Sequence, residues 1–207
     1  TLSAISTSTL YALCAMAIAT VLGLMVALGV AYGSPRFVWL ERISVLPLTI
    51  SAVTIGLGIL ITYDTAPYDF RSTWIITPLA HSLIALPLVV RIVLPVVRQI
   101  PRGLQSVAST LGATPLQTWL TVDRPLMSRA VGASAAIAFA ISIGEFGATS
   151  FLTRRSSETL PVTISRLLSR PGDALRTQAY ALCVIIVVIS MIAIFLIDML
   201  RPARKAK

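Results

Sequence analysis

Five long stretches of the chain carry almost no charge, and they limit its fold more than any other feature. A helix needs about 20 apolar residues to cross the hydrocarbon core of a bilayer, so each stretch is long enough to span a membrane. Apart from Glu145, no charged residue lies at positions 1–35, 43–63, 72–90, 130–153 or 177–197.

The overall composition agrees with a membrane protein. Of the 207 residues, 56% are hydrophobic and only 12% are charged, whereas a soluble domain carries roughly 25% charged residues. This excludes an ordinary soluble domain, a disordered chain and a secreted disulfide scaffold. Cys14 and Cys183 both lie in uncharged stretches. We expect both cysteines to act as small buried hydrophobic residues.

The net charge of +9 would suggest a nucleic-acid partner in a soluble protein. Here the basic residues lie in loops and at the ends of the apolar stretches, where they contact lipid headgroups and set the orientation. No basic run is interleaved with aromatic residues, as single-strand binding requires. We therefore expect membrane lipid, and no nucleic acid, as a partner.

We expect an all-α membrane protein with a single transmembrane domain over residues 1–207. Pro78, Pro87 and Pro95 predict a kinked or broken third span. The five expected spans lie at about 4–32, 43–63, 72–97, 128–152 and 177–200.

Lysine and arginine counts predict the orientation. If the C-terminal tail is cytoplasmic, the loops 33–42 and 98–129 are also inside, and ten basic residues face the cytoplasm against six outside. This arrangement places the N-terminus outside. Because the chain also opens with Thr1 rather than Met, we expect a preceding span and a longer natural polypeptide.

Residues 101–125 form the most informative loop. Leu104, Val107, Ala108 and Leu111 follow the i, i+3, i+4, i+7 pattern of an amphipathic helix. Gly112 then stops this helix. Thr114 and Pro115 are typical of an N-cap and a first helical position. A second short helix carries Leu116, Trp119 and Leu120, and we expect Pro125 to end it. From the residues alone, the loop is either a docking element or an interfacial helix that seals the bundle.

Three motifs resemble permease subunits of ATP-binding-cassette (ABC) importers. Segment 101–125 is similar to their EAA loop, which has a glycine and a proline at fixed spacing. Residues 142–149 resemble the S-L-G-E-F-G-A-T run of permeases for molybdate, sulfate, ferric iron and thiamine, and residues 159–168 resemble the T-L-P stretch that follows it. In the loop, Ala108, Gly112, Val122 and Pro125 match the pattern, while Ser106, Val107 and Arg124 depart from it.

The resemblance implies a MetI-like five-helix permease core, in a multi-pass protein of the bacterial plasma (inner) membrane. It implies three protein partners: ABC ATPase subunits, a substrate-binding protein, and a second permease lobe or copy. The partner ATPase would bind ATP and Mg²⁺, and this chain would hold no cofactor and have no catalytic residue. The stretch 85–94 is most similar to thiamine and ferric-iron permeases, with molybdate or sulfate as the alternative. The residues expected to couple to the ATPase are Leu104, Val107, Ala108, Leu111, Gly112, Leu116, Trp119 and Pro125.

Glu145 is the only acidic residue away from the ends of the expected spans. Its neighbours Gly144 and Gly147 leave room for a helix contact or a passing solute, so Glu145 either lines the pathway or is a structural carboxylate at a broken helix. Arg91 either lines the pathway or extends to the membrane edge. His81 is the only histidine, and we expect it to be hydrogen-bonded structure rather than a metal ligand.

The expected outer loop, 153–176, is rich in arginine. Its apolar residues predict a short amphipathic helix beginning near Pro161. This loop is either a docking surface for an acidic face of a substrate-binding protein or a solvated interfacial helix. The docking candidates are Arg154, Arg155, Arg166 and Arg170.

Two other classes of protein compete with the importer permease. An ion-coupled secondary transporter usually carries several ionisable residues within its spans, whereas here only Glu145, Arg91 and His81 qualify. A membrane enzyme would show a catalytic motif such as HExxH or GxSxG, and the sequence has neither. The sequence also has no Walker A motif, so an ATP-driven permease requires a separate ATPase.

Overall fold

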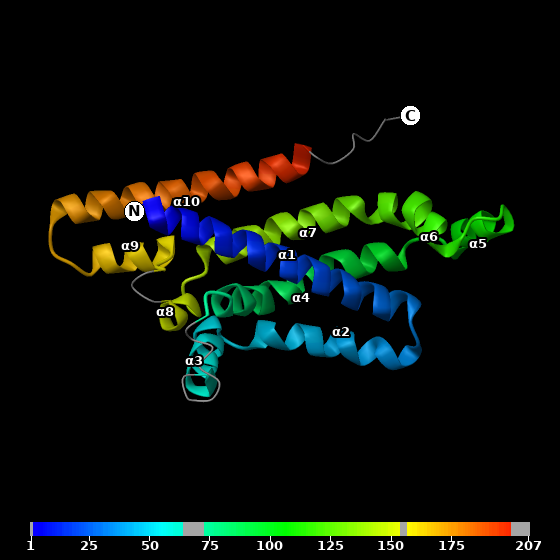
Figure 1. Cartoon of the computed structure of the whole chain (residues 1–207), viewed down its shortest axis with the longest axis horizontal. Helices are drawn as coiled ribbons and strands as arrows, with labels where there is room; N and C mark the ends of the chain where they lie inside the picture. The colour runs from blue at the N-terminus through cyan, green and yellow to red at the C-terminus, as the bar shows by residue number, and fades with distance from the viewer. Residues whose placement is uncertain (1, 64–72, 154–156, 200–207) are drawn as a thin grey trace.

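The computed structural model of the chain describes residues 2–63, 73–153 and 157–199. Within these ranges the chain forms helices and no β-strand, which confirms the all-α fold class. Figure 1 shows the helices running mostly along one long axis. The long helices are α1 (Leu2–Tyr32), α4 (Ile76–Arg98), α7 (Arg124–Gly144) and α10 (Asp173–Met199). The shorter ones are α2 (Val38–Val45), α3 (Ala52–Tyr63), α5 (Arg102–Thr110), α6 (Pro115–Thr118), α8 (Thr149–Leu152) and α9 (Leu160–Leu168).

The core of the bundle consists of α1, α4 and α7, which pack against one another. The buried face of α1 is built almost entirely from small residues, which let helices approach closely in a membrane. Gly23 shows how close this approach is, because a Cβ atom at this position would lie 2.5 Å from Cγ1 of Val89 in α4. The small buried residues of α1 include Ala12, Ala15, Ala19, Gly23 and Ala27.

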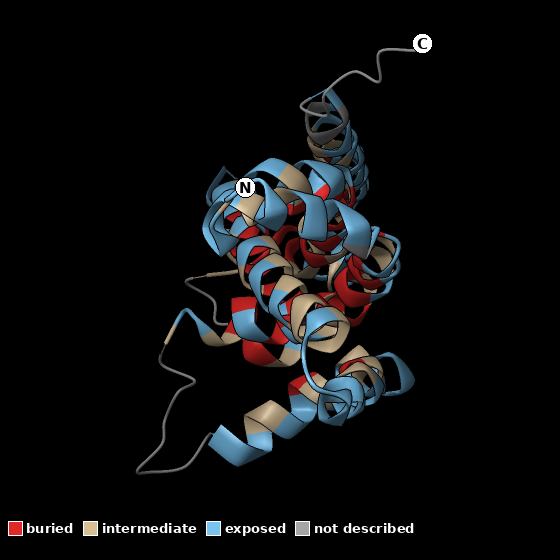
Figure 2. Ribbon diagram, turned by 90° about the vertical axis from the view of Figure 1, so that its right-hand side faces the viewer, coloured by how far each residue is buried: buried red, intermediate tan, exposed pale blue. Residues whose placement is uncertain are grey.

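Helix α10 lies outside this core and packs against α7 and α9. Figure 2 shows buried residues facing the bundle interior and exposed residues covering the outer surfaces of the helices. Most of the apolar surface of α10 is therefore free to face lipid or another subunit. Among the described residues, four helices are long and apolar enough to cross a membrane, and one bent pair raises the number of candidate spans to five.

The bent pair replaces the single span expected at 43–63. Helix α2 is followed by the 3₁₀ turn η2 (Leu46–Thr49), and α3 then leaves at an angle of 98°. Pro47 is the physical reason, because proline has no N–H to continue an α-helix and its ring clashes with the preceding turn. Ile50 then adopts an extended conformation (φ −106°, ψ 136°), which completes the break.

Prolines do not break α4, so of the two alternatives that the sequence predicted, a kinked or a broken helix, the broken one is wrong. Pro78 lies in the first turn, where its missing N–H costs no internal hydrogen bond. Pro87 and Pro95 lie inside the helix, which continues unbroken to Arg98. Close packing on both α1 and α7 holds this stretch of α4 in place.

The fourth span also differs from the expected range 128–152. It begins earlier, because Pro115–Gly144 is one continuous helical run of 30 residues. It also ends earlier, at Gly144, and α8 is a separate short helix.

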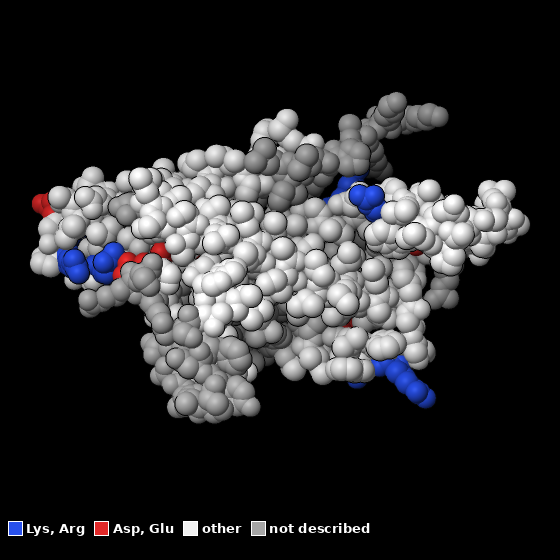
Figure 3. Space-filling model, in the orientation of Figure 1, with Lys and Arg blue, Asp and Glu red and all other residues white. Residues whose placement is uncertain are grey.

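The two ends of the bundle carry different elements. Segment 101–125 projects from one end, and α3, α8 and α9 lie toward the other, which we call the distal end (Figure 1). On the face shown in Figure 3, charged atoms gather toward the two ends of the long axis, and the broad middle is uncharged. This is the distribution expected if the long axis crosses the membrane.

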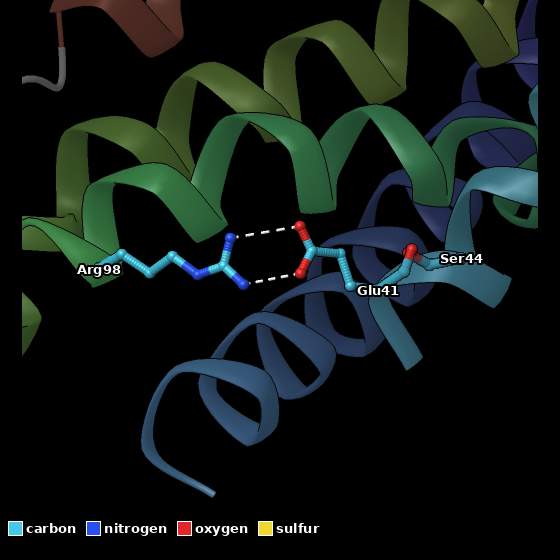
Figure 4. A network of polar contacts seen from close by, with 3 residues as sticks. All are labelled: Glu41, Ser44 and Arg98. Carbon is cyan, nitrogen blue, oxygen red and sulfur yellow. Dashed lines mark hydrogen bonds and ion pairs between the residues drawn. The ribbon is translucent and has the colours of Figure 1, made fainter. Parts of the chain in front are cut away.

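Helix α2 is fastened to the segment end of α4 by an ion pair. The guanidinium of Arg98 donates two hydrogen bonds to the carboxylate of Glu41, at 3.2 Å and 2.7 Å (Figure 4). Ser44, on the same helix as Glu41, donates its hydroxyl to the Glu41 carbonyl at 2.8 Å. The bent second span is thereby joined to α4 three residues before segment 101–125 begins.

Candidate functional site

Segment 101–125 folds as two short helices joined by a tight turn. Helix α5 ends in a Schellman motif, in which Ala113 N–H donates to the Ala108 carbonyl and Gly112 N–H donates to the Ser109 carbonyl, both at 3.0 Å. Gly112 has a φ of +84°, a left-handed conformation that glycine adopts without strain. The predicted stop at Gly112 is confirmed.

The second helix, α6, begins with the cap that the sequence predicted. The Thr114 hydroxyl accepts a hydrogen bond from Gln117 N–H at 3.3 Å, and the Gln117 side chain accepts one from Thr114 N–H at 2.8 Å. Pro115 occupies the first helical position. This reciprocal capping box satisfies two backbone N–H groups at the start of α6.

The apolar stripe of α5 faces away from the protein. Val107 and Leu111 are 59% and 82% exposed, and Leu104 is also exposed. Leu116 of α6 extends this surface. Three of the other coupling candidates lie differently: Ala108 is half-buried, Gly112 is exposed at the turn, and Trp119 is half-buried. An exposed apolar surface on a polar segment is typical of a docking site for another protein.

The sequence predicted that Pro125 ends a helix, and this prediction is wrong. Pro125 lies in the first turn of α7. The five residues before α7, Trp119–Asp123, form a π-helical turn, η4. Arg124 N–H donates to the Trp119 carbonyl, five residues back. The wider turn accommodates a proline that would disrupt the regular i to i−4 pattern. Segment 101–125 is therefore continuous with α7.

A cavity of about 890 Å³ lies between segment 101–125 and the end of α1. Trp119 and Asp123 line it from one side, and Leu28, Gly29 and Tyr32 line it from the other. Asp123 is buried and contacts both α1 and α5. Its contacts could not be predicted from the sequence, because its partners lie 91 and 18 residues away.

At the distal end, Glu145 occupies the break between α7 and α8. Its carboxylate Oε1 accepts a hydrogen bond from Ala148 N–H at 2.9 Å, and its carbonyl accepts one from the Thr149 hydroxyl at 2.9 Å. This is the structural arrangement that the sequence left open, a carboxylate bonded to backbone at a broken helix. Glu145 is nevertheless only half-buried, so the same carboxylate still reaches the surface.

His81 braces this break from α4. Its two ring nitrogens lie 2.7 Å from the Ser142 hydroxyl and 2.6 Å from the Thr149 hydroxyl, on either side of the break. The ring is buried and has a partner at both nitrogens, which agrees with hydrogen-bonded structure. In the described ranges no three His, Cys, Asp or Glu residues are grouped so that they could hold a metal ion.

The two candidate glycines at the break have different surroundings. A Cβ atom at Gly147 would lie 3.2 Å from side chains of Ala52 and Val53 in α3, so Gly147 packs closely there. Gly144 faces open space, with nothing within 4 Å of such an atom. The open side of the break is therefore formed by Gly144, with the exposed ring of Phe146 nearby in sequence.

The arginines proposed for the pathway and for binding-protein docking lie in different parts of the bundle. Arg91 lies on the surface of α4, seven residues before its end. Arg166 pairs with Glu158 at 2.7 Å, and Arg170, just beyond α9, is exposed. Arg154 and Arg155 lie outside the described residues. The structure thus places Arg166 and Arg170 at the end of the bundle opposite segment 101–125.

Residues 19–206 match the family model of the binding-protein-dependent transport system inner membrane component. The chain belongs to this family. It is 31% identical over 180 residues to PhnV of Salmonella typhimurium, whose name assigns it to a 2-aminoethylphosphonate transport system, with 86% of this chain and 67% of that protein covered. It is 30% identical over 176 residues to the molybdenum transport permease ModB of Haemophilus influenzae, with 78% and 76% covered. It is also 28% identical over 180 residues to the sulfate transport permease CysT of Salmonella typhimurium, with 82% and 65% covered.

Family membership confirms the resemblance seen in the sequence. The chain is a multi-pass inner-membrane permease of the ABC importer class. Transport systems of this family depend on a binding protein, and the importer class implies an ATPase partner as well.

Proposed function

We propose that segment 101–125 is the site at which the ATPase subunit docks on this permease, and that it lies in the cytoplasm. The supporting observation is the exposed apolar surface of Leu104, Val107, Leu111 and Leu116 at one end of an apolar bundle. A rigid Schellman turn and a capping box hold this surface in one shape. Preorganised surfaces bind at a lower entropic cost.

Docking at this segment connects ATP binding on the ATPase to the distal end through one continuous helical run. The helical run Pro115–Gly144 begins in the docking segment and ends at the Glu145 break, a distance of about 45 Å at 1.5 Å per residue. ATP binding favours the permease state to which the closed ATPase pair binds more tightly. Movement of the segment then tilts or shifts α7 and changes the surroundings of Glu145.

We propose further that the solute is a small anion. The relatives are named for the transport of 2-aminoethylphosphonate, molybdenum and sulfate. Arg91, an exposed cation on a membrane-spanning helix, is the residue in this chain best suited to attract an anion along the pathway. The resemblance to thiamine and ferric-iron permeases remains the alternative, with Glu145 as the residue suited to a cation.

Docking is tested by substitutions on α5. Leu111→Asp and Val107→Asp place a charge in the proposed apolar contact, and we expect each to abolish co-purification of the ATPase. Thr110→Asp is the matched control, because Thr110 is exposed on the same helix but outside the stripe. Retention of the ATPase by both stripe variants would contradict the proposal.

The solute is tested by uptake into proteoliposomes that contain the permease, its ATPase and its binding protein. Labelled 2-aminoethylphosphonate, molybdate, sulfate, thiamine and ferric iron are compared at equal concentration. We expect ATP-dependent uptake of one of the three anions, and a loss of uptake in Arg91→Gln. Uptake of thiamine or ferric iron alone would overturn the anion proposal and leave the docking proposal standing.

A further inference from the structure

Asp123 has a position that neither docking nor solute passage explains. It is only 5% exposed, although it lies near the end of the bundle, in the π-helical turn before α7. Its carboxylate Oδ1 accepts a hydrogen bond from the Gln105 side-chain amide at 2.9 Å and lies 3.4 Å from the Tyr32 hydroxyl, which donates to it. A buried carboxyl group is costly unless it is hydrogen-bonded, so both contacts stabilise its position.

The two contacts join three elements that are distant in sequence. Tyr32 is the last residue of α1, Gln105 lies on α5, and Asp123 is the last residue of the π-helical turn before α7. Gln105 lies on the side of α5 that faces the protein, whereas Val107 and Leu111 face away from it. One carboxylate therefore connects the inner side of the segment to two core helices.

Packing does not provide this connection. The cavity of about 890 Å³ separates α5 and α6 from the end of α1, and in the described chain α5 packs most extensively on α6. The contacts described between its two sides are polar, and they involve the side chains of Tyr32, Gln105 and Asp123. The hydrogen bonds of Asp123 cross this gap, and without them its buried carboxylate would have no described partner.

We propose that Asp123 is a positioning residue that links α1 to segment 101–125, so that a movement imposed on α5 is passed to α1 as well as to α7. This inference rests on the proposed ATPase docking. Without the link, the segment still binds the ATPase through its outer apolar surface, but α1 no longer follows it. The ATPase then hydrolyses ATP with less transport for each ATP consumed.

The test uses the complete complex of permease, ATPase and binding protein in proteoliposomes. Asp123→Ala removes the link, and Asp123→Asn keeps the side-chain shape and one acceptor oxygen. The matched control is Ser109→Ala, because Ser109 lines the same cavity but its hydroxyl donates within α5, to the Ser106 carbonyl. The readout is the number of solute molecules taken up per ATP hydrolysed, using 2-aminoethylphosphonate, molybdate or sulfate, whichever the wild-type complex transports.

For Asp123→Ala we expect normal co-purification of the ATPase, and a loss of solute per ATP of about fivefold or more, the lower end of typical coupling between sites. Asp123→Asn should lie between Asp123→Ala and the wild type. Gln105→Ala should reduce the ratio in the wild type but not further in Asp123→Ala, because both substitutions remove the same contact. Ser109→Ala should resemble the wild type.

An unchanged ratio in Asp123→Ala would overturn this inference. Loss of ATPase binding in both Asp123→Ala and Asp123→Asn would also overturn it, because the proposal places Asp123 in transmission and not in docking. Failure of the proposed function itself looks different: the wild-type permease would then bind no ATPase through segment 101–125, and its uptake would not depend on ATP.

Discussion

At the scale of single residues, Gly112 is one of two described glycines whose positive φ limits substitution, and the other is Gly172. Its φ of +84° lies in the left-handed region, which costs other residues of order 1–3 kcal/mol. Its N–H also closes the turn by donating to the Ser109 carbonyl. The residue therefore sets the angle between α5 and α6, and with it the shape of the proposed docking surface.

We expect Gly112→Ala to weaken ATPase binding about fivefold, which corresponds to a strain of about 1 kcal/mol. Gly112→Pro should abolish transport while membrane insertion stays intact, because proline can neither adopt this φ nor donate the hydrogen bond. Gly103→Ala is the control, since Gly103 lies on the same helix with open space around it. Equal ATPase stimulation by Gly112→Pro and the wild type would contradict this account.

The sequence predicted the structural role of a residue well where that residue's partners are close to it in the chain. The Gly112 stop and the Thr114 cap depend on residues within five positions of one another, and both are confirmed. Asp123 and His81 depend on partners 18 to 91 residues away, so their roles required the fold. A weak signal for Asp123 did exist, because it is an isolated acid two residues before a proline in a basic segment.

At the scale of elements, α3 is held against the Glu145 break by a contact between two backbones. A Cβ atom at Gly56 would lie 2.5 Å from Cα and 2.7 Å from the carbonyl oxygen of Ala148. Neither atom belongs to a flexible side chain, so the helices would have to separate. The bent second span thereby supports the loop that carries Glu145.

We expect Gly56→Ala to destabilise the protein by about 1–3 kcal/mol, as overpacking does in other cores. Gly58→Ala, two residues along the same helix, should leave stability unchanged or slightly raised, because nothing lies within 4 Å of its Cβ position. Thermal unfolding in detergent measures both. Similar melting temperatures for the two variants would show that α3 does not pack on α8 in this way.

The Glu41–Arg98 pair joins α2 to α4, and its exposure limits its strength. The two side chains are 34% and 48% exposed, so we expect a contribution of about 0.2–1 kcal/mol, reduced further by salt. Glu41→Arg and Arg98→Glu should each lower the melting temperature, and the double exchange should restore most of the loss. If the losses in melting temperature simply add in the double variant, Glu41 and Arg98 make no specific contact with each other.

Sequence periodicity located most of the apolar helices but not their breaks. Hydropathy does not distinguish a straight span from the bent pair α2–α3, because both are equally apolar. Proline alone is also ambiguous: Pro47 ends a helix, Pro87 and Pro95 lie within one, and Pro125 follows a π-helical turn. Residue type alone therefore does not decide the outcome at a proline.

At the scale of the whole molecule, the two ends of the bundle serve different partners in the proposed mechanism. Segment 101–125 lies at one end, and Arg166 and Arg170 lie at the other with α9. The α9 end is fastened to α1 by a hydrogen bond from Leu160 N–H to the Ser8 hydroxyl at 2.7 Å. Movement of α1 would therefore also reach the surface proposed to receive the binding protein.

We expect Arg170→Glu to weaken association of the binding protein at low ionic strength, with a smaller effect at high salt. Arg154→Glu and Arg155→Glu should act in the same direction. Arg166 is a weaker candidate, because it already pairs with Glu158. The control is Arg36→Glu, near the other end of α1, which should leave docking unchanged. An unchanged affinity of Arg170→Glu at low salt would remove Arg170 from the docking surface.

The central claim is that segment 101–125 lies in the cytoplasm and is covered by the ATPase. It is tested most directly by labelling a single cysteine at position 111, the site of the 82% exposed Leu111, after replacing Cys14 and Cys183 with alanine. A membrane-impermeant maleimide is added to inside-out and right-side-out vesicles. The account predicts labelling only in inside-out vesicles and protection when the ATPase is bound. Labelling in right-side-out vesicles would contradict it.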